Sequence, residues 1–207
     1  MGDIYLASAT ADYDLGNRAH QSLLPEGRPT NWYHNPDYDD NSHKILPEET
    51  VNMAWNLIKD FKPATNEKAR KFMARYNPAL GRDPVVEKAT FISGDTYWKG
   101  IYHHNTAKYI NDFYGCPDPY RITEMEEAAV CDVLDRFGML DRYIGLRAAV
   151  NLDDFMNGAT PESVWTVSFM EALEETEGEG LGNIFELAMD NLFRAGSLII
   201  DYLLEKK

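Results

Sequence analysis

Three short segments carry side chains suited to binding a sugar and a flat heterocycle. Glu124-Met125-Glu126 offers carboxylates that accept hydrogen bonds from vicinal hydroxyls, and a thioether that can cover an apolar sugar face. Ser93-Gly94-Asp95 is followed by Tyr97 and Trp98, whose rings present stacking faces. Glycine within that segment lets the backbone approach a ligand. Asn151 adds an amide, which both donates and accepts hydrogen bonds and so suits a purine edge.

Each segment also has a plain structural interpretation. Ser93-Gly94-Asp95 fits a strand-to-helix turn in which Asp95 caps the helix. Glu124-Met125-Glu126 fits a helix N-terminus, where the dipole favours acidic side chains. Asn151 opens Asn-Leu-Asp-Asp, which is ordinary turn chemistry. Taken one at a time, the segments leave both interpretations open.

Strands that alternate with helices must position these segments. Apolar and β-branched runs predict strands over 2–10, 85–92, 121–123 and 143–150, and a long turn-rich loop over 25–47. Helical periodicity and capping residues predict helices that begin at 47, 65, 98, 125 and 160, and a last helix. That last helix is expected to bury Ile184, Leu187, Ala188, Asn191, Leu192, Ala195, Leu198, Ile199 and Leu203.

The alternation of strands and helices predicts an α/β fold, with a three-layer mixed sheet flanked by helices. In such sheets ligands bind beyond the carboxyl ends of the strands. Segments 93–95, 124–126 and 151–153 each follow a predicted strand. They are therefore the first candidates for a binding site.

Composition narrows the class of protein. The 207 residues include 20 basic and 34 acidic side chains, for a formal net charge of −14, and 12% are aromatic. This many aromatics argues against a disordered chain, and the acidic balance argues against a nucleic-acid binder. No apolar run is long enough for a transmembrane helix, no signal peptide is visible, and the two cysteines fit a reducing compartment. We expect a cytoplasmic protein without a metal site.

The order and spacing of the three segments resemble those of the nucleoside phosphorylase superfamily. The order is strand–SGDxY, strand–EME with an alanine-rich helix, and then R-x-x-x-N-x-D at Arg147–Asp153. The long loop after the first strand, residues 96–100 and Asn151 resemble most closely the purine nucleoside permease family. The resemblance extends from Gly2-Asp3 to the last helix. It implies a phosphorylase/hydrolase-like fold in a single domain over 1–207, equivalent to the C-terminal two-thirds of the family fold.

The resemblance also implies roles for the binding residues. Glu126 would hold the ribose hydroxyls, and Met125 would pack against the sugar. Tyr97 would stack on the base. The wall of the pocket would be formed by Ser93, Gly94 and Trp98.

For catalysis, the resemblance points to Asn151. It occupies the place where many relatives carry an acid that helps the base to leave, and an amide can hydrogen-bond a purine anion but cannot deliver a full proton. Asp153 or Asp154 would serve instead if the register shifts by two or three residues. The implied activity is cleavage of the N-glycosidic bond of purine ribonucleosides by phosphorolysis or hydrolysis, with no cofactor and phosphate as a possible co-substrate. The alternatives are a non-catalytic nucleoside-binding or uptake protein and an inactive interaction subunit.

One departure from the family pattern concerns phosphate. Relatives carry their phosphate-binding glycine-rich loops and an arginine on strands before the Gly-Asp strand, and this chain starts at that strand. The fold is thus expected to be N-terminally incomplete: the chain is a truncated or split form, another polypeptide supplies these elements, or phosphorolysis is lost. The first strand would then have an unpaired edge, which predicts a homo-oligomer or a partner chain.

Overall fold

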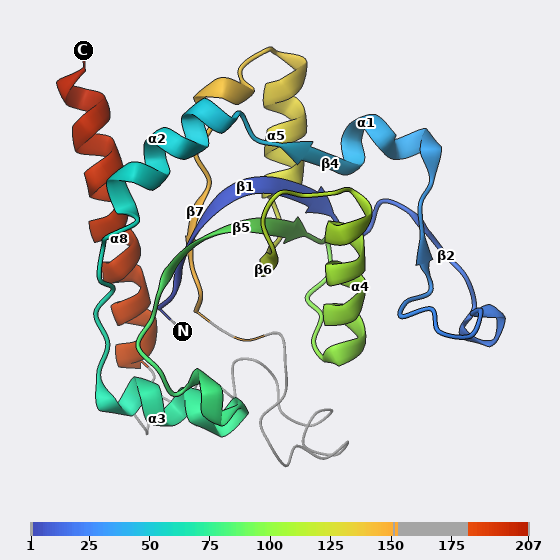
Figure 1. The fold of residues 1–207 in the computed structure, drawn as a ribbon, viewed down its shortest axis with the longest axis horizontal. Helices are drawn as coiled ribbons and strands as arrows, with labels where there is room; N and C mark the ends of the chain where they lie inside the picture. The colour runs from blue at the N-terminus through green and yellow to red at the C-terminus, as the bar shows by residue number, and fades with distance from the viewer. Residues whose placement is uncertain (1, 151, 153–181, 207) are drawn as a thin grey trace. The chain divides into compact units, whose positions relative to one another are not determined.

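The computed structural model describes residues 2–150, 152 and 182–206 (Figure 1). The chain is divided into two compact units. Unit 1 combines Met1–Ile4, Leu57–Glu87 and Leu146–Lys207, and unit 2 combines Tyr5–Asn56 and Lys88–Gly145. That residues 1–207 make a single domain stays a prediction.

A mixed sheet confirms the predicted α/β class. Its strands are β1 (Ile4–Asp12), β4 (His43–Ile45), β5 (Val86–Ser93), β6 (Tyr120–Glu124) and β7 (Leu146–Ala148). Their order is β4-β1-β5-β6, and β7 also pairs with β1. β5 and β6 are parallel, whereas β1 and β4 are antiparallel. A separate two-stranded sheet joins β2 (Asn17–Arg18) to β3 (Trp32–Tyr33).

The helices are α1 (Asp39–Ser42), α2 (Glu48–Ile58), α3 (Glu67–Tyr76), α4 (Ile101–Phe113), α5 (Glu127–Arg136) and α8 (Gly182–Glu205). Helices α2 to α5 begin within three residues of their predicted starts, whereas α1 lies in the stretch predicted to be an irregular loop. Asn66 caps α3 by accepting the Ala69 N–H. Gly115 and Gly138 follow α4 and α5 with φ of +61° and +63°, the left-handed conformation that ends many helices. The helix predicted to begin at residue 160 lies outside the described residues.

The prediction of an unpaired edge on the first strand is wrong. Within unit 2, β1 lies between β5 and the short strand β4, with Ala9 paired to Ile45 and Ala11 to His43. Residues 4–11 are all buried, as expected of a strand covered on both faces. β4 falls inside the stretch predicted to be an irregular loop, because three residues are too few to show a strand periodicity.

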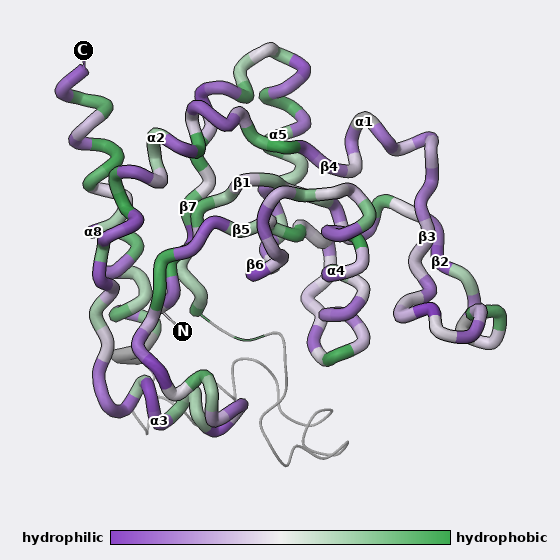
Figure 2. The backbone as a smooth tube through the Cα atoms, in the orientation of Figure 1, coloured by the Kyte–Doolittle hydropathy of each residue, from purple (hydrophilic) through white to green (hydrophobic). Residues whose placement is uncertain are grey.

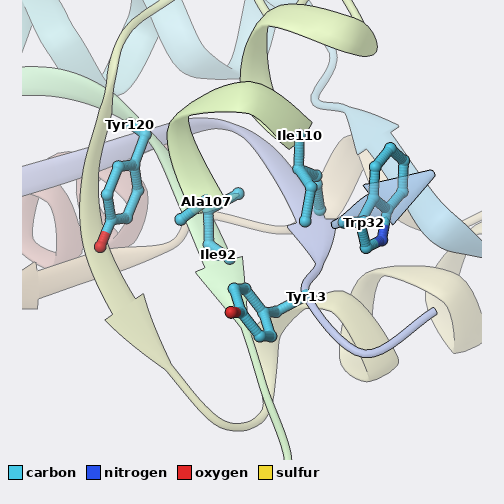
Figure 3. Packing of buried hydrophobic residues seen from close by; sticks show 7 residues of the cluster. Tyr13, Trp32, Ile92, Ala107, Ile110 and Tyr120 are labelled. Carbon is cyan, nitrogen blue, oxygen red and sulfur yellow. The ribbon is translucent and has the colours of Figure 1, made fainter. Parts of the chain in front are cut away.

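The core of unit 2 gathers aromatic side chains around α4 (Figure 3). Trp32 is fully buried and meets Tyr109, Phe113 and Tyr114 edge-on, with ring centroids 5.5–6.1 Å apart. Gly16 is required here, because a Cβ at this position would lie 2.6 Å from Cε2 of Trp32. These contacts hold the chain segment between β1 and β4 against α4. The buried cluster consists of Ala11, Tyr13, Trp32, Ile92, Ala107, Ile110 and Tyr120.

Unit 1 is held by polar contacts of buried side chains. Asn191 of α8 accepts the Ala64 N–H at 2.6 Å and donates to the Ala64 carbonyl at 2.9 Å, which satisfies an amide that is fully buried. Asp3 pairs with Arg82 at 2.9 Å and accepts the Val85 N–H at 2.7 Å. These bonds tie the start of the chain and the segment after α2 into one unit.

The buried face of α8 is narrower than predicted. Ala188, Asn191, Ala195 and Ile199 are buried, as expected. Leu198 and Leu203 were predicted to be buried, but they are 42% and 43% exposed. Apolar residues nevertheless recur along the length of this helix (Figure 2). In the described part of the chain, no helix is both long enough and apolar enough to span a bilayer.

Candidate functional site

Three strands of unit 2 end side by side. β5 and β6 are parallel at this end, with Ser93 opposite Glu124, and the Gly94 N–H donates to the Glu124 carbonyl at 3.0 Å. The Tyr13 N–H, just after β1, donates to the Ser93 carbonyl at 2.7 Å. Two of the three predicted binding segments therefore start from neighbouring backbone positions, and the end of β1 lies beside them. We call residues 12–14, 93–98 and 124–127 the strand-end site.

Ser93 and Glu124 together cap α5. The Ser93 hydroxyl donates to one Glu124 carboxylate oxygen and accepts the Ala128 N–H at 2.8 Å. The other carboxylate oxygen of Glu124 accepts the N–H groups of Glu126 and Glu127, at 2.6 and 2.7 Å. These are N–H groups that a helix cannot satisfy internally. The cap explains why α5 begins at Glu127, two residues later than predicted.

Capping by Glu124 separates the two acids of the Glu-Met-Glu motif. Glu126 is exposed, and Met125 is 51% exposed, so both side chains reach solvent at the edge of the sheet. Glu127 is buried, at 1% exposure. Of the two acids of the motif, Glu124 holds the backbone and Glu126 reaches solvent, whereas Glu127, the residue after the motif, lies in the interior. The Ser93 hydroxyl is used within the cap, and its role as a pocket wall stays a prediction.

The two aromatic residues after β5 have different surroundings. Tyr97 is 56% exposed, with the Lys99 ammonium 6.0 Å from its ring centroid. Trp98 is half-buried and stacks on Tyr13, with centroids 4.9 Å apart. Gly94 lies against this pair, because a Cβ there would be 3.4 Å from Nε1 of Trp98 and 3.5 Å from Cβ of Tyr13. A ligand at this edge would meet Tyr97 directly and Trp98 as part of a packed cluster.

Tyr13, Arg18 and His103 join the site without having been predicted. The Tyr13 hydroxyl and Nδ1 of His103 are 2.7 Å apart, and Trp98 stacks on His103 at 5.7 Å. The Arg18 guanidinium lies 4.9 Å from the Tyr13 ring centroid and donates to the Tyr13 carbonyl. Burial raises the pKa of Tyr13. Burial also lowers the pKa of His103, and the positive charge of Arg18 lowers it further. Tyr13 follows a strand end, and that position is the signal that would have identified it.

Acidic side chains shape the turn that follows β1. Asp12 accepts the N–H groups of Asp14 and Leu15 at 2.7 and 2.9 Å. Burial raises the pKa of Asp12, although these two hydrogen bonds act in the opposite direction. Asp14 in turn accepts the Asp95 N–H at 2.6 Å. Asp14 therefore links the turn after β1 to the turn after β5.

The predicted catalytic residues Asn151 and Asp153 lie outside the described residues, as does Asp154. In residues 2–150, 152 and 182–206, no group of three His, Cys, Asp or Glu side chains is arranged to hold a metal ion. His103 and His104, adjacent in sequence, face different neighbours, namely Tyr13 and Tyr120.

A known protein family matches almost the whole chain. The sequence model of the purine nucleoside permease family matches residues 3–207. The chain belongs to this family. A curated relative, a probable purine nucleoside permease of Schizosaccharomyces pombe, is 27% identical over 199 residues. That match covers 94% of this chain and 51% of the relative, so the chain spans about half the length of the family member it matches.

Solved structures with a similar backbone include two enzymes. A 5′-methylthioadenosine/S-adenosylhomocysteine nucleosidase from Neisseria meningitidis is 15% identical, with a TM-score of 0.48 over 96% of this chain and 61% of the enzyme. A futalosine hydrolase of Helicobacter pylori is 14% identical, with a TM-score of 0.44 over 98% of this chain and 61% of the hydrolase. The assignment of the fold rests on the family match and on the strands and helices described above.

Proposed function

We propose that the chain binds a purine ribonucleoside at the strand-end site and cleaves its N-glycosidic bond. The observation that carries this proposal is the pairing of Ser93 with Glu124. Because of this pairing, the segment that carries Tyr97 and the segment that carries Glu126 begin at adjacent backbone positions. The family's name, purine nucleoside permease, supports a purine nucleoside as the ligand.

Each side chain at this edge has a chemical task in the proposal. The Glu126 carboxylate accepts hydrogen bonds from the ribose hydroxyls, and the Met125 thioether covers the apolar face of the sugar. Tyr97, exposed on the neighbouring segment, stacks on the base. Capping by Glu124 keeps the backbone of Met125 and Glu126 in one conformation, so that these contacts need little further ordering.

The proposed reaction breaks the bond between C1′ of ribose and the purine nitrogen. The electron pair of that bond leaves with the base, which takes up a proton, and water or phosphate adds to C1′. The sugar passes through an oxocarbenium-like state, which a nearby carboxylate stabilises. Asn151 or Asp153 remains our candidate to assist the departing base. An acid at this position contributes about 10²–10⁴-fold to the rate, so an amide in its place slows the reaction without abolishing it.

Binding without turnover is the second candidate. The S. pombe relative is named as a probable permease, and the carboxyl group of Glu124 is already used in capping α5. Under this alternative the same edge binds the nucleoside, and no free base is formed. An inactive subunit, with neither binding nor turnover, is the remaining outcome.

An assay of free base separates these candidates. Purified protein is incubated with inosine or adenosine, with and without inorganic phosphate, and the released base is measured by chromatography. Release that depends on phosphate indicates phosphorolysis, and release without phosphate indicates hydrolysis. Binding of the nucleoside in calorimetry without release identifies the permease-like candidate. The absence of both release and binding contradicts the proposal.

A further inference from the structure

Helix α8 presents apolar side chains on two faces. One face, formed by Ala188, Asn191, Ala195 and Ile199, is buried within unit 1. A second face carries large apolar side chains that remain in solvent. We call it the α8 stripe, and it consists of Phe185 (50% exposed), Met189 (42%), Phe193 (73%), Ile200 (57%), Leu203 (43%) and Leu204 (59%).

Outside the stripe the exposed surface of the helix is mostly polar, with Leu198 (42% exposed) as an exception. Asp190 and Arg194 form an i,i+4 ion pair at 3.7 Å on the flank beside the stripe. Ser197 and Asp201 continue that flank at helical spacing. A helix that only lay on its own fold would need one apolar face, and polar residues would cover the remainder. The second apolar face of α8 therefore requires a different explanation.

We propose that the α8 stripe is a two-fold interface with a second copy of this chain, with the two α8 helices antiparallel. The spacing of the stripe carries this inference. The series consists of five stripe residues and Gly196, and it leaves out Leu203: Phe185, Met189 and Phe193 follow at intervals of four, Gly196 follows Phe193 at an interval of three, and Ile200 and Leu204 follow again at intervals of four. The series reads the same in both directions. A reversed second copy thus matches the first position by position.

This register pairs five of the six large side chains with an apolar partner or a glycine, and places Leu203 opposite Glu186. Phe185 faces Leu204 of the second copy, Met189 faces Ile200, and Phe193 faces Gly196. Phe193 is the most exposed member of the stripe, and Gly196 has no side chain in the way of its ring. Every contact occurs twice, once on each side of an axis between residues 194 and 195, as a two-fold interface demands.

The area of the stripe agrees with a dimer. At about 150–200 Å² for each large apolar side chain, the exposed fractions amount to roughly 500–600 Å² on one chain. That is as large as the largest apolar patch on a typical monomer, ~300–600 Å². Two copies together bury roughly 1,000–1,200 Å², close to the lower limit of specific interfaces, ~1,200 Å². We therefore expect a dimer that dissociates on dilution.

Two matched variants test the role of the stripe. Met189→Glu places a charge inside it, and Leu198→Glu places the same charge at a residue of equal exposure, 42%, outside it. Sedimentation velocity of the full chain, across a dilution series, is expected to show a dimer for wild type and Leu198→Glu. Met189→Glu is expected to associate at least tenfold more weakly. Circular dichroism of all three proteins checks that the variants fold.

Disulfide trapping tests the register. Met189→Cys combined with Ile200→Cys is expected to form a disulfide-linked dimer under mild oxidation, because these positions face each other across the axis. Residues 189 and 200 of one chain are about 16 Å apart along the helix and cannot join to each other. Either cysteine alone is expected to stay at the background that wild type shows.

Three outcomes overturn the proposal. The first is a wild-type protein that sediments as a monomer at every concentration. The second is equal weakening of the dimer by both glutamate variants, which would place the interface elsewhere. The third is efficient linkage by a single cysteine variant, which would contradict the antiparallel register.

Discussion

The Ser93 hydroxyl donates a hydrogen bond to the Glu124 carboxylate across the parallel pair β5–β6. The same carboxylate accepts hydrogen bonds from the N–H groups at the start of α5. One side-chain contact thus joins two strands to a helix and fixes where the helix begins. It also gives different roles to Glu124 and Glu126, the two acids of one short motif. Glu124 maintains the structure of the site, and Glu126 is left at its surface.

Stability should therefore depend on Glu124 and not on Glu126. We expect Glu124→Ala to lower the free energy of unfolding by about 1–3 kcal/mol, because backbone N–H groups and the Ser93 hydroxyl lose their acceptor. Glu126→Ala should stay within about 0.5 kcal/mol of wild type, as exposed substitutions do. Urea unfolding at pH 7 measures both. Equal loss in the two variants would refute this division.

The two aromatic residues after β5 should likewise have different roles, one in stability and the other in binding. Trp98→Ala removes the ring stacked on Tyr13 and should cost about 2 kcal/mol or more of stability, below the cost for a fully buried tryptophan. Tyr97→Ala should leave stability unchanged and weaken nucleoside binding by about 1–3 kcal/mol, the usual worth of stacking on a base. Urea unfolding and calorimetric titration with adenosine give the two quantities. A Tyr97→Ala variant with wild-type affinity would remove Tyr97 from the site.

Gly145 tests the packing of the buried acid Glu127. A Cβ at residue 145 would lie 2.8 Å from the Glu127 carboxyl carbon and 2.9 Å from the Ala7 Cβ. Overpacking of this kind costs about 1–3 kcal/mol, so Gly145→Ala should destabilise unit 2 by that amount. The double variant with Glu127→Ala should be less destabilised than the sum of the two single variants, because one collision is gone. Strict additivity in urea unfolding would show that the two residues do not meet.

Stability should fall on mild acidification because of His103. Burial, with help from the Arg18 charge, lowers its folded-state pKa below the value near 6.5 of an unfolded histidine. The unfolded chain then binds the proton first as pH falls. The contribution of His103 is complete above pH 6.5 and is lost as pH drops from 6.5 towards the folded-state pKa.

The comparison of pH 7.5 with pH 5.5 isolates this effect. The urea midpoint of wild type should fall more over this interval than that of His103→Gln, which cannot titrate there. Burial, followed by the neighbouring Lys44, also lowers the pKa of His43, so His43→Gln should reduce the pH dependence in the same direction. Identical pH dependence in wild type and His103→Gln would contradict the assignment.

The sequence predicts those parts of the fold that local patterns encode. The apolar run of β1, the apolar periodicity of α3 and the glycines that follow α4 and α5 are local patterns, and their elements lie where expected. The short strand β4 escapes prediction, since its pairing with β1 is a long-range contact.

The site could be predicted only in part. Position after a strand made Ser93, Tyr97 and Glu126 candidates, and their binding roles stay predictions. It could not tell which acid of the motif would turn inwards as a cap. That choice depends on the Ser93 hydroxyl on a different strand. The contact between Tyr13 and His103, 90 residues apart, arises only when the excursion after β1 folds onto α4.

Calorimetric titration with adenosine and 2′-deoxyadenosine tests the central claim most directly. The account predicts that wild type binds adenosine more tightly, and that Glu126→Ala loses most of this difference while keeping its stability. The reason is that the Glu126 carboxylate accepts hydrogen bonds from the ribose hydroxyls, which are worth about 1–3 kcal/mol. Failure of wild type to bind either nucleoside, or an unchanged preference for adenosine in Glu126→Ala, would contradict the account.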